Sequence, residues 1–188
     1  MNTKKILSLG IFTFSILLLA SSCKKDKTDD PAPTNQGELI TTVQLIFTDT
    51  ITGLVVDTAT FSDPDGPGGV APTQDSILLQ AGRVYSTEVI LLDESKIPVV
   101  YISDEVAAES DVHLFVFSSL PASGFLTTTI SDVDVNGQPV GLESYLVAGS
   151  SATGSYTVEL RHFDSAALKQ ANTIYETDVQ VTFGVRLN

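Results

Sequence analysis

Residues 132 to 143, DVDVNGQPVGLE, match the calcium-loop template D-x-[DN]-x-[DN]-G-x5-E at every required position. Calcium takes carboxylate and carbonyl oxygens as ligands, and an EF-hand holds such a loop between two helices. The segment therefore raises calcium binding as a hypothesis. The matching residues are Asp132, Asp134, Asn136, Gly137 and Glu143.

The flanks of this segment favour strands over helices. FLTTTIS before it is β-prone, and ESYLVAG after it has no helical stripe. Asn136-Gly137 is a strong signal for a type I′ hairpin turn, and Pro139 removes a backbone donor that EF-hand loops use. We interpret the segment as a β-hairpin. Alternation from Ile130 would bury both aspartates, so either a bulge resets the parity near Ser131 or the acids lie at the loop tip, where they can bind calcium weakly.

A second acidic loop, DPDGPGG at 63 to 69, joins two expected strands. Its glycines and prolines are turn residues, and Asp63 favours turn initiation. Asp63 and Asp65 can share an oxygen-lined calcium site with loop carbonyls, or they can lie on a solvated turn. Whether the two acidic loops meet is not decided by the sequence.

The two histidines, His113 and His162, lie in or at the end of expected strands. His162 has the parity of inward-facing residues, which predicts a partly buried, hydrogen-bonded side chain at the edge of the core. With an Asp or Glu the pair can ligate a transition metal. However, no H-x-x-x-H or H-E-x-x-H spacing supports a metalloenzyme motif.

Other catalytic patterns are missing from the sequence. It has no G-x-S-x-G elbow for a serine nucleophile and no phosphate-binding glycine loop followed by Lys. Among so many acids nothing selects a glycosidase pair. We therefore expect no catalytic residues and no cofactor, apart from the calcium hypothesis.

The hydrophobic pattern of the chain has mostly a period of two. In LITTVQLIFT, for example, Leu39, Val43, Leu45 and Phe47 share one face. Such segments, rich in Val, Ile, Thr and Tyr, predict an all-β fold, a single antiparallel Ig-like β-sandwich of seven to eight strands. The expected strands include 39–48, 51–61, 75–80, 83–92, 112–117, 154–163 and 178–187.

One or two short helices interrupt this pattern. The first is expected at 103–110 with Ser103 as a cap, and its acids form an exposed face. The second is expected at 165–172, where Ser165 or Asp164 caps the start and Asn172 ends the helix.

The beginning of the chain has the three parts of an export signal. Lys4 and Lys5 precede an apolar run from Ile6 to Ala20, and small residues lead to Cys23, the only cysteine. The run is shorter than the ~20 residues of a membrane-spanning helix. No intramolecular disulfide can form with a single cysteine.

The stretch LLLASSCKKD resembles the lipobox of bacterial lipoproteins, in the form found in Bacteroidota-type outer-membrane lipoproteins. The resemblance implies a signal peptide at 1–22, cleavage before Cys23, and lipidation of Cys23 with acyl chains such as palmitate. Together these chains anchor the protein stably. The segments DPDGPGG, NGQPVGL and LRH resemble a small, uncharacterised β-sandwich family of such lipoproteins. That resemblance implies an outer-membrane location, periplasmic or surface-exposed, and no activity.

Residues 23–37 form a charged stretch rich in Pro, Thr and Asn, which predicts a flexible tether before a single domain at 38–188. The whole chain has a formal net charge of −13, and 20 acidic and 5 basic residues lie from Glu38 onward. Nucleic acid is therefore not an expected partner, because phosphate binding needs clustered Lys and Arg.

These observations predict a lipid-anchored cell-envelope β-sandwich that serves as a non-catalytic binding, adhesion or accessory module, with a protein or glycan as partner. One alternative is a glycan-binding lipoprotein of a polysaccharide uptake system, and another is a secreted hydrolase. The chain has no Trp, so sugar-stacking faces would have to come from Tyr85, Tyr101, Tyr145, Tyr156 and Tyr175.

Overall fold

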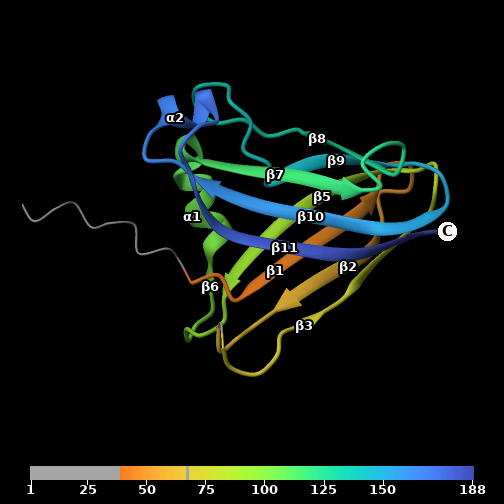
Figure 1. Cartoon of the computed structure of the whole chain (residues 1–188), viewed down its shortest axis with the longest axis horizontal. Helices are drawn as coiled ribbons and strands as arrows, with labels where there is room; N and C mark the ends of the chain where they lie inside the picture. Colours follow the sequence, from red (N-terminus) through yellow and green to blue (C-terminus); the bar gives the residue numbers. More distant parts are fainter. Residues whose placement is uncertain (1–38, 67) are drawn as a thin grey trace, which may run out of the picture. The chain divides into compact units, whose positions relative to one another are not determined.

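The computed structural model describes residues 39–66 and 68–188, which form two β-sheets packed face to face (Figure 1). One sheet has seven strands in the order β3-β2-β1-β5-β9-β8, with β6 paired to β5, and the other has the order β4-β11-β10-β7. Neighbouring strands run antiparallel except β4 and β11, which are parallel. The predicted all-β sandwich with short helices is confirmed, but the described residues form eleven strands where seven to eight were expected, and one strand pair is parallel. The expected signal peptide, Cys23 and the tether lie outside the described residues.

The strands of both sheets are short to medium in length, and the helices are shorter than three turns. The seven-stranded sheet consists of β1 (Thr42–Asp49), β2 (Val55–Ser62), β3 (Thr73–Gln74), β5 (Val84–Asp93), β6 (Val100–Tyr101), β8 (Leu126–Ile130) and β9 (Glu143–Ala148). The four-stranded sheet consists of β4 (Ser76–Leu79), β7 (His113–Leu120), β10 (Ala152–His162) and β11 (Glu176–Leu187). The helical segments are α1 (Ile102–Ala108), the 3-10 turn η1 (Ser110–Val112) and α2 (Ala166–Ala171).

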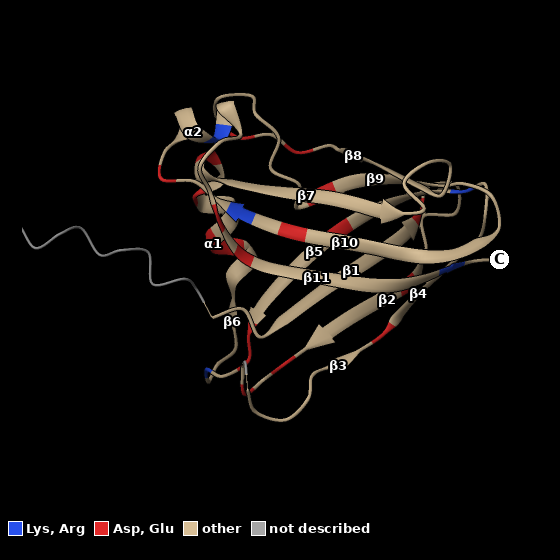
Figure 2. Cartoon of the chain, viewed as in Figure 1, with Lys and Arg blue, Asp and Glu red and all other residues tan. Residues whose placement is uncertain are grey.

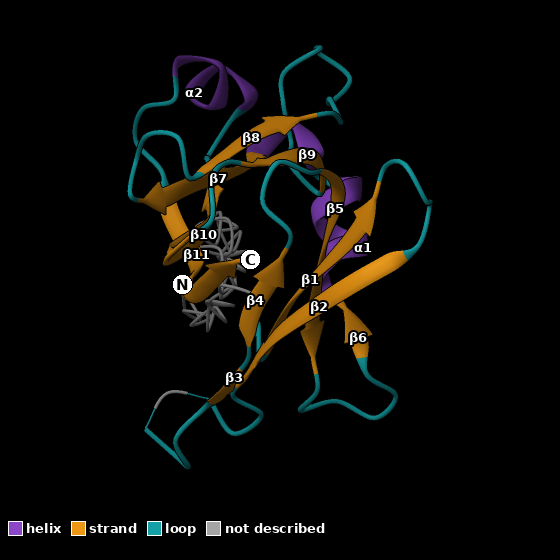
Figure 3. Cartoon of the chain, turned by 90° about the vertical axis from the view of Figure 1, so that its right-hand side faces the viewer, coloured by secondary structure: helices purple, strands orange, loops and turns teal. Residues whose placement is uncertain are grey.

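Alternation along the strands builds the core between the two sheets. Figure 3 shows β7, β10 and β11 of one sheet on the left and β1, β2 and β5 of the other on the right. On β1, Val43, Leu45 and Phe47 are at most 1% exposed, as their parity predicts. Leu39 precedes β1 and is 44% exposed, so it does not belong to this face. Large side chains from both sheets fill the core, among them Tyr85, Leu91 and Leu146 from one sheet and Phe115, Tyr156, Leu160 and Phe183 from the other.

The segment 132–143 is a hairpin, as predicted, and it links β8 to β9. Its turn is not type I′, because Gly137 has a φ of +75° while Asn136 does not have a positive φ. Gly137 N–H donates to the Asp134 carbonyl at 3.0 Å, and Asp134 N–H donates to the Gln138 carbonyl at 2.8 Å. These bonds define a three-residue loop, in which a type I turn is followed by a left-handed glycine.

Both expected helices are present. α2 begins after Ser165, whose side chain accepts a hydrogen bond from Leu168 N–H, and it ends at Asn172 in the left-handed conformation, as expected. α1 begins after Tyr101 without a side-chain cap, so the expectation of Ser103 as a cap is wrong. Of the four acids expected on an exposed helix face, Asp104, Glu105 and Glu109 are exposed, whereas Asp111 lies in η1 and is half-buried.

Candidate functional site

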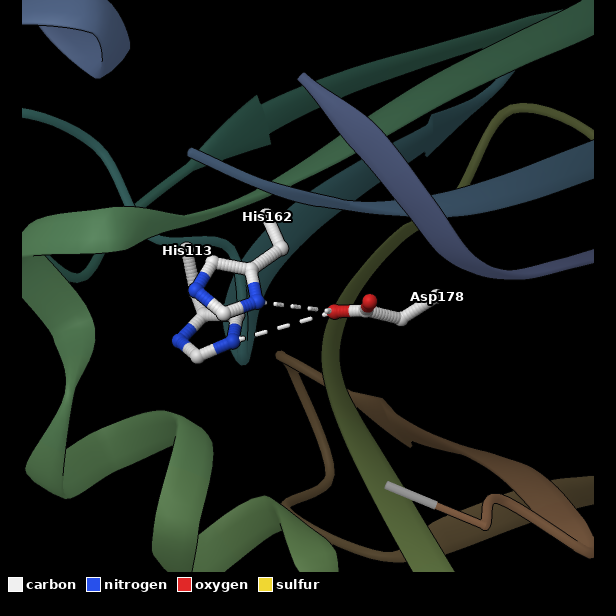
Figure 4. A group of neighbouring side chains, drawn as sticks. All are labelled: His113, His162 and Asp178. Carbon is white, nitrogen blue, oxygen red and sulfur yellow. Dashed lines mark ion pairs between the residues drawn. The ribbon is translucent and has the colours of Figure 1, made fainter. Parts of the chain in front are cut away.

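The two histidines meet at one end of the four-stranded sheet. His113 is the first residue of β7 and His162 the last of β10, and the two are direct partners in the antiparallel register. Both side chains follow the inward parity of their strands, so their rings lie 4.5 Å apart, centroid to centroid, with an angle of 34° between their planes. Figure 4 shows the two rings next to each other, with Asp178 facing both of them.

Asp178 joins the two histidines because of a β-bulge in β11. The register between β10 and β11 shifts there: Leu160 faces Val179, but Arg161 faces Thr177 and Asp178 is skipped. A bulge bends its strand and re-aims a side chain. Oδ2 of Asp178 therefore lies 3.8 Å from His113 Nε2 and 3.9 Å from His162 Nδ1 (Figure 4).

Burial controls the charge of this cluster, named here the His-His-Asp cluster (His113, His162 and Asp178). The His113 and Asp178 side chains are 3% and 9% exposed, and that of His162 is 19% exposed. Burial lowers the pKa of His113, only partly opposed by the Glu109 carbonyl. Burial also raises the pKa of Asp178, although both histidines oppose this shift. Both pKa shifts have the same cause, because the charged forms of His113 and Asp178 are poorly solvated in this buried position.

The tautomer of His113 follows from its neighbour. Nδ1 of His113 lies 3.0 Å from the Glu109 carbonyl oxygen, which can only accept a hydrogen bond. Nδ1 therefore carries the proton, and in the neutral ring Nε2 presents its lone pair toward Asp178. The sequence pointed to the two histidines together with an Asp or Glu, but it did not select Asp178, because a bulge leaves no pattern in the residue types.

The aspartates of the calcium-loop template are engaged within the protein. Asp132 accepts backbone hydrogen bonds from Gly141 and Leu142 at 2.8 and 3.0 Å. One oxygen of Asp134 accepts from two backbone N–H groups of its turn, and the other lies 2.7 Å from Lys169 Nζ. Asp134 is 7% exposed and lies beside α2, not at a solvated tip as expected.

The second acidic loop lies at the opposite edge of the seven-stranded sheet, between β2 and β3. Asp65 accepts a hydrogen bond from Val70 N–H at 2.8 Å. Oδ1 of Asp63 is buried and has no hydrogen-bond partner in the part of the chain that the structure describes. The two acidic loops do not meet, and calcium binding by either loop stays a prediction.

A cleft of about 610 Å³ lies between β7 and β8, the terminal strands of the two sheets. Its aromatic side is a row in which Phe117 stacks between Phe115 and Tyr156, at centroid distances of 6.2 and 5.8 Å. The Tyr156 hydroxyl is 2.7 Å from Thr128 Oγ1 on β8, and burial raises the pKa of this tyrosine. None of the lining residues is charged: Leu114, Phe115, Val116, Phe117, Ser118, Ser119, Ala122, Leu126, Thr127, Thr128, Ile130, Pro139 and Tyr156.

Two hydrogen bonds close the ends of the cleft. The Ser119 hydroxyl lies within hydrogen-bond distance of two carbonyl oxygens, those of Pro121 at 3.2 Å and Leu126 at 3.3 Å, and Phe115 N–H donates to the Val140 carbonyl at 2.7 Å. Because backbone groups alternate along a strand, Phe117 on β7 also turns its N–H and C=O away from β10, toward the cleft. The free stretch of strand edge between the closures is about 13 Å long, at ~3.3 Å per residue.

The tyrosines do not form one sugar-stacking face. Tyr85 and Tyr156 are buried, and Tyr175 is 40% exposed with the guanidinium of Arg161 4.1 Å above its ring. Tyr101 and Tyr145 are exposed, but they pair with β5 at Leu92 and Ser86, respectively. Six residues along a strand place them about 20 Å apart.

Searches with family models, among curated proteins and among solved structures found no match to this chain. Within residues 39–66 and 68–188, neither helix has the length and apolar character needed to cross a bilayer.

Proposed function

We propose that the protein is a lipid-anchored cell-envelope module that binds, without catalysis, a short uncharged and apolar stretch of a partner protein in the cleft between β7 and β8. The observation that carries this proposal is the contrast in charge. The chain has a formal net charge of −13, and its acids are spread over α1, the strands and the loops (Figure 2). The cleft, in contrast, is lined by no charged residue.

The walls of the cleft favour an extended peptide as its occupant. A terminal strand presents backbone N–H and C=O groups that an added strand can pair with, while alternate side chains of that strand enter pockets. Phe117, the half-buried member of the aromatic row, offers apolar surface for such side chains together with Ile130 and Pro139, while Phe115 and Tyr156 are buried in the core. The length between the two closures fits about four residues of extended chain.

The lipid anchor rests on the sequence around Cys23. Lipidation would hold the module at the outer membrane and leave the sandwich free to meet a partner. Cys23→Ser should leave a precursor that incorporates no labelled fatty acid, and normal labelling would overturn this part of the proposal. In intact cells, added protease should degrade the protein if it faces outside and spare it if it faces the periplasm.

The cleft is tested with a fluorescent peptide of alternating valine and threonine, followed by anisotropy. Thr127 lines the cleft, whereas Thr129, two residues further on the same face of β8, does not. Thr127→Glu should weaken peptide binding at least tenfold because it places a charge beside the apolar site. Thr129→Glu should bind like the wild type. Equal binding by all three proteins, or no binding by the wild type, would overturn the proposed site.

A further inference from the structure

We propose that His113, His162 and Asp178 bind one divalent transition-metal ion, with zinc as the best match to their ligand atoms. This inference goes beyond the proposed function and does not rest on it. Within the described ranges these residues form the one group of three or more His, Cys, Asp or Glu side chains close enough to share a metal ion.

The geometry of the ligand atoms is close to that of a metal site. One ligand atom from each residue lies within 4.8 Å of the other two. In a tetrahedral zinc site with bonds of ~2.1 Å, the ligand atoms are about 3.4 Å apart. The two distances from Asp178 Oδ2 to the histidine nitrogens, 3.8 and 3.9 Å, exceed this value by only about half an ångström. Small side-chain rotations can remove that difference.

The backbone prepares His113 for this role. A metal-bound histidine commonly donates its second ring N–H to a carbonyl or carboxylate, which fixes the ring and its tautomer. The Glu109 carbonyl, at the end of α1, accepts this hydrogen bond from His113 Nδ1 at 3.0 Å. Nε2, the atom nearest to Asp178, is then the coordinating nitrogen.

The charges in the cluster also favour a cation. Asp178 is largely buried, and its ion-pair partners in the described part of the chain are the two histidines. At 3.8 and 3.9 Å, both contacts are longer than hydrogen bonds, so neither histidine nitrogen pairs closely with the carboxylate. A buried carboxylate is costly unless it is paired or bound to a metal. A divalent ion bound by all three residues would pair with this carboxylate and would link three neighbouring strands.

The ligand types decide which class of ion fits. Two imidazole nitrogens and one carboxylate oxygen suit zinc and other late first-row metals, whereas calcium takes oxygen ligands only. This site is therefore distinct from the calcium hypothesis for the acidic loops. The partly exposed His162 gives an ion and a fourth ligand, such as water, a way in from solvent.

The test is a titration of the full chain, purified in detergent and freed of metal with chelator, with zinc and then with cobalt. We expect one equivalent to bind and cobalt to give the visible absorption of a four-coordinate ion. His162→Gln and Asp178→Asn should each weaken zinc binding by more than about 100-fold, because losing a ligand costs more than losing an outer hydrogen bond. Asp164→Asn changes an exposed acid near His162 and should bind like the wild type, as should Cys23→Ser, which excludes the thiol as a ligand.

A second measurement keeps the proposal testable if a variant does not fold. The chain has only two histidines, and both lie in the cluster. Zinc should therefore protect the wild type from diethyl pyrocarbonate, a histidine-modifying reagent. The proposal is wrong if zinc gives no protection, or if the folded cluster variants bind zinc as tightly as Asp164→Asn does. The second result would assign the zinc to surface acids.

Discussion

The Nζ atom of Lys169 lies 2.7 Å from Oδ2 of Asp134, and both side chains are only 1% exposed. The same ammonium donates to the Ser110 carbonyl at 2.6 Å. This pair therefore links three segments that are distant in sequence: α2, the β8–β9 hairpin and η1. It also gives a structural role to an aspartate that matches the calcium-loop template.

Removing the lysine should destabilise the fold. Lys169→Met leaves the Asp134 carboxylate buried beside α2 without its cation, and breaking such a pair costs about 3 kcal/mol, the lower end of the usual range. We place it there because α2 is short and can open to admit water. Urea unfolding measures the difference. Asp134→Asn combined with Lys169→Met should recover part of the loss, and strictly additive effects would show that the pair is not coupled.

The same pair should make stability depend on acid. Burial by itself would raise the pKa of Asp134, but the hydrogen bonds from Lys169, Gln138 and Asn136 hold it below its usual value of 3.8. A lowered pKa means stability that is complete above the usual value and is lost as the pH falls through the folded value. The stability gap between wild type and Lys169→Met should therefore shrink as unfolding is measured from pH 7 toward pH 3. A constant gap would contradict this assignment.

Gly154 and Gly184 form a matched pair on neighbouring strands. A Cβ on Gly154 would lie 2.1 Å from the Leu120 carbonyl oxygen, whereas one on Gly184 would meet only the Ser76 hydroxyl at 3.5 Å. Gly154→Ala should therefore destabilise the protein by about 1–3 kcal/mol, because the backbone must shift. Gly184→Ala should unfold at the wild-type urea concentration or above it, since alanine suits a strand better than glycine does. If the two substitutions change the stability equally, the segment between β7 and β8 can move to accommodate a Cβ at position 154.

The Tyr85 hydroxyl forms hydrogen bonds with the backbone of Gln80, in the segment that precedes β5. The hydroxyl accepts from Gln80 N–H at 2.9 Å and lies 3.2 Å from the Gln80 carbonyl oxygen, in the manner of the tyrosine corners of β-sandwiches. Tyr85→Phe leaves these groups without a partner and should cost about 1–3 kcal/mol in thermal or urea unfolding. Tyr145 is exposed, and Tyr145→Phe should change stability by less than about 0.5 kcal/mol. If Tyr85→Phe leaves the stability unchanged, a water molecule satisfies the Gln80 backbone groups in place of the hydroxyl.

The response of the protein to added calcium tests whether the segment 132–143 binds the metal or serves only as a hairpin. Because the Asp132 carboxylate is held by the backbone N–H groups of Gly141 and Leu142, we expect it not to ligate calcium. Adding millimolar calcium should therefore shift the thermal midpoint of Asp132→Asn by the same amount as that of the wild type, whatever that amount is. A shift seen in the wild type and absent from this variant would make the segment a metal loop. The same comparison with Asp63→Asn and Asp65→Asn tests the other loop.

Several local features of the molecule could be predicted from the sequence. The alternation of Val43, Leu45 and Phe47 predicts the buried face of β1, because consecutive side chains of a strand point to opposite sides. Ser165 and Asn172 mark the ends of α2 for an equally local reason, since each acts on backbone groups within one turn. The parity of His162 likewise placed it at the edge of the core.

Only the tertiary structure decided which distant residues meet. Asp178 joins His113 and His162 through a bulge, and an extra residue in a strand pairing has no signature in residue types. Asp134 is buried, not at a solvated tip as expected, because it pairs with Lys169, which lies 35 residues away on another element. The sequence by itself determined the inward face of β1, both ends of α2 and the parity of His162, because these depend on neighbours along the chain. The cluster, the buried ion pair and the cleft depend on how two sheets and α2 pack together, and that packing brings residues together regardless of their spacing.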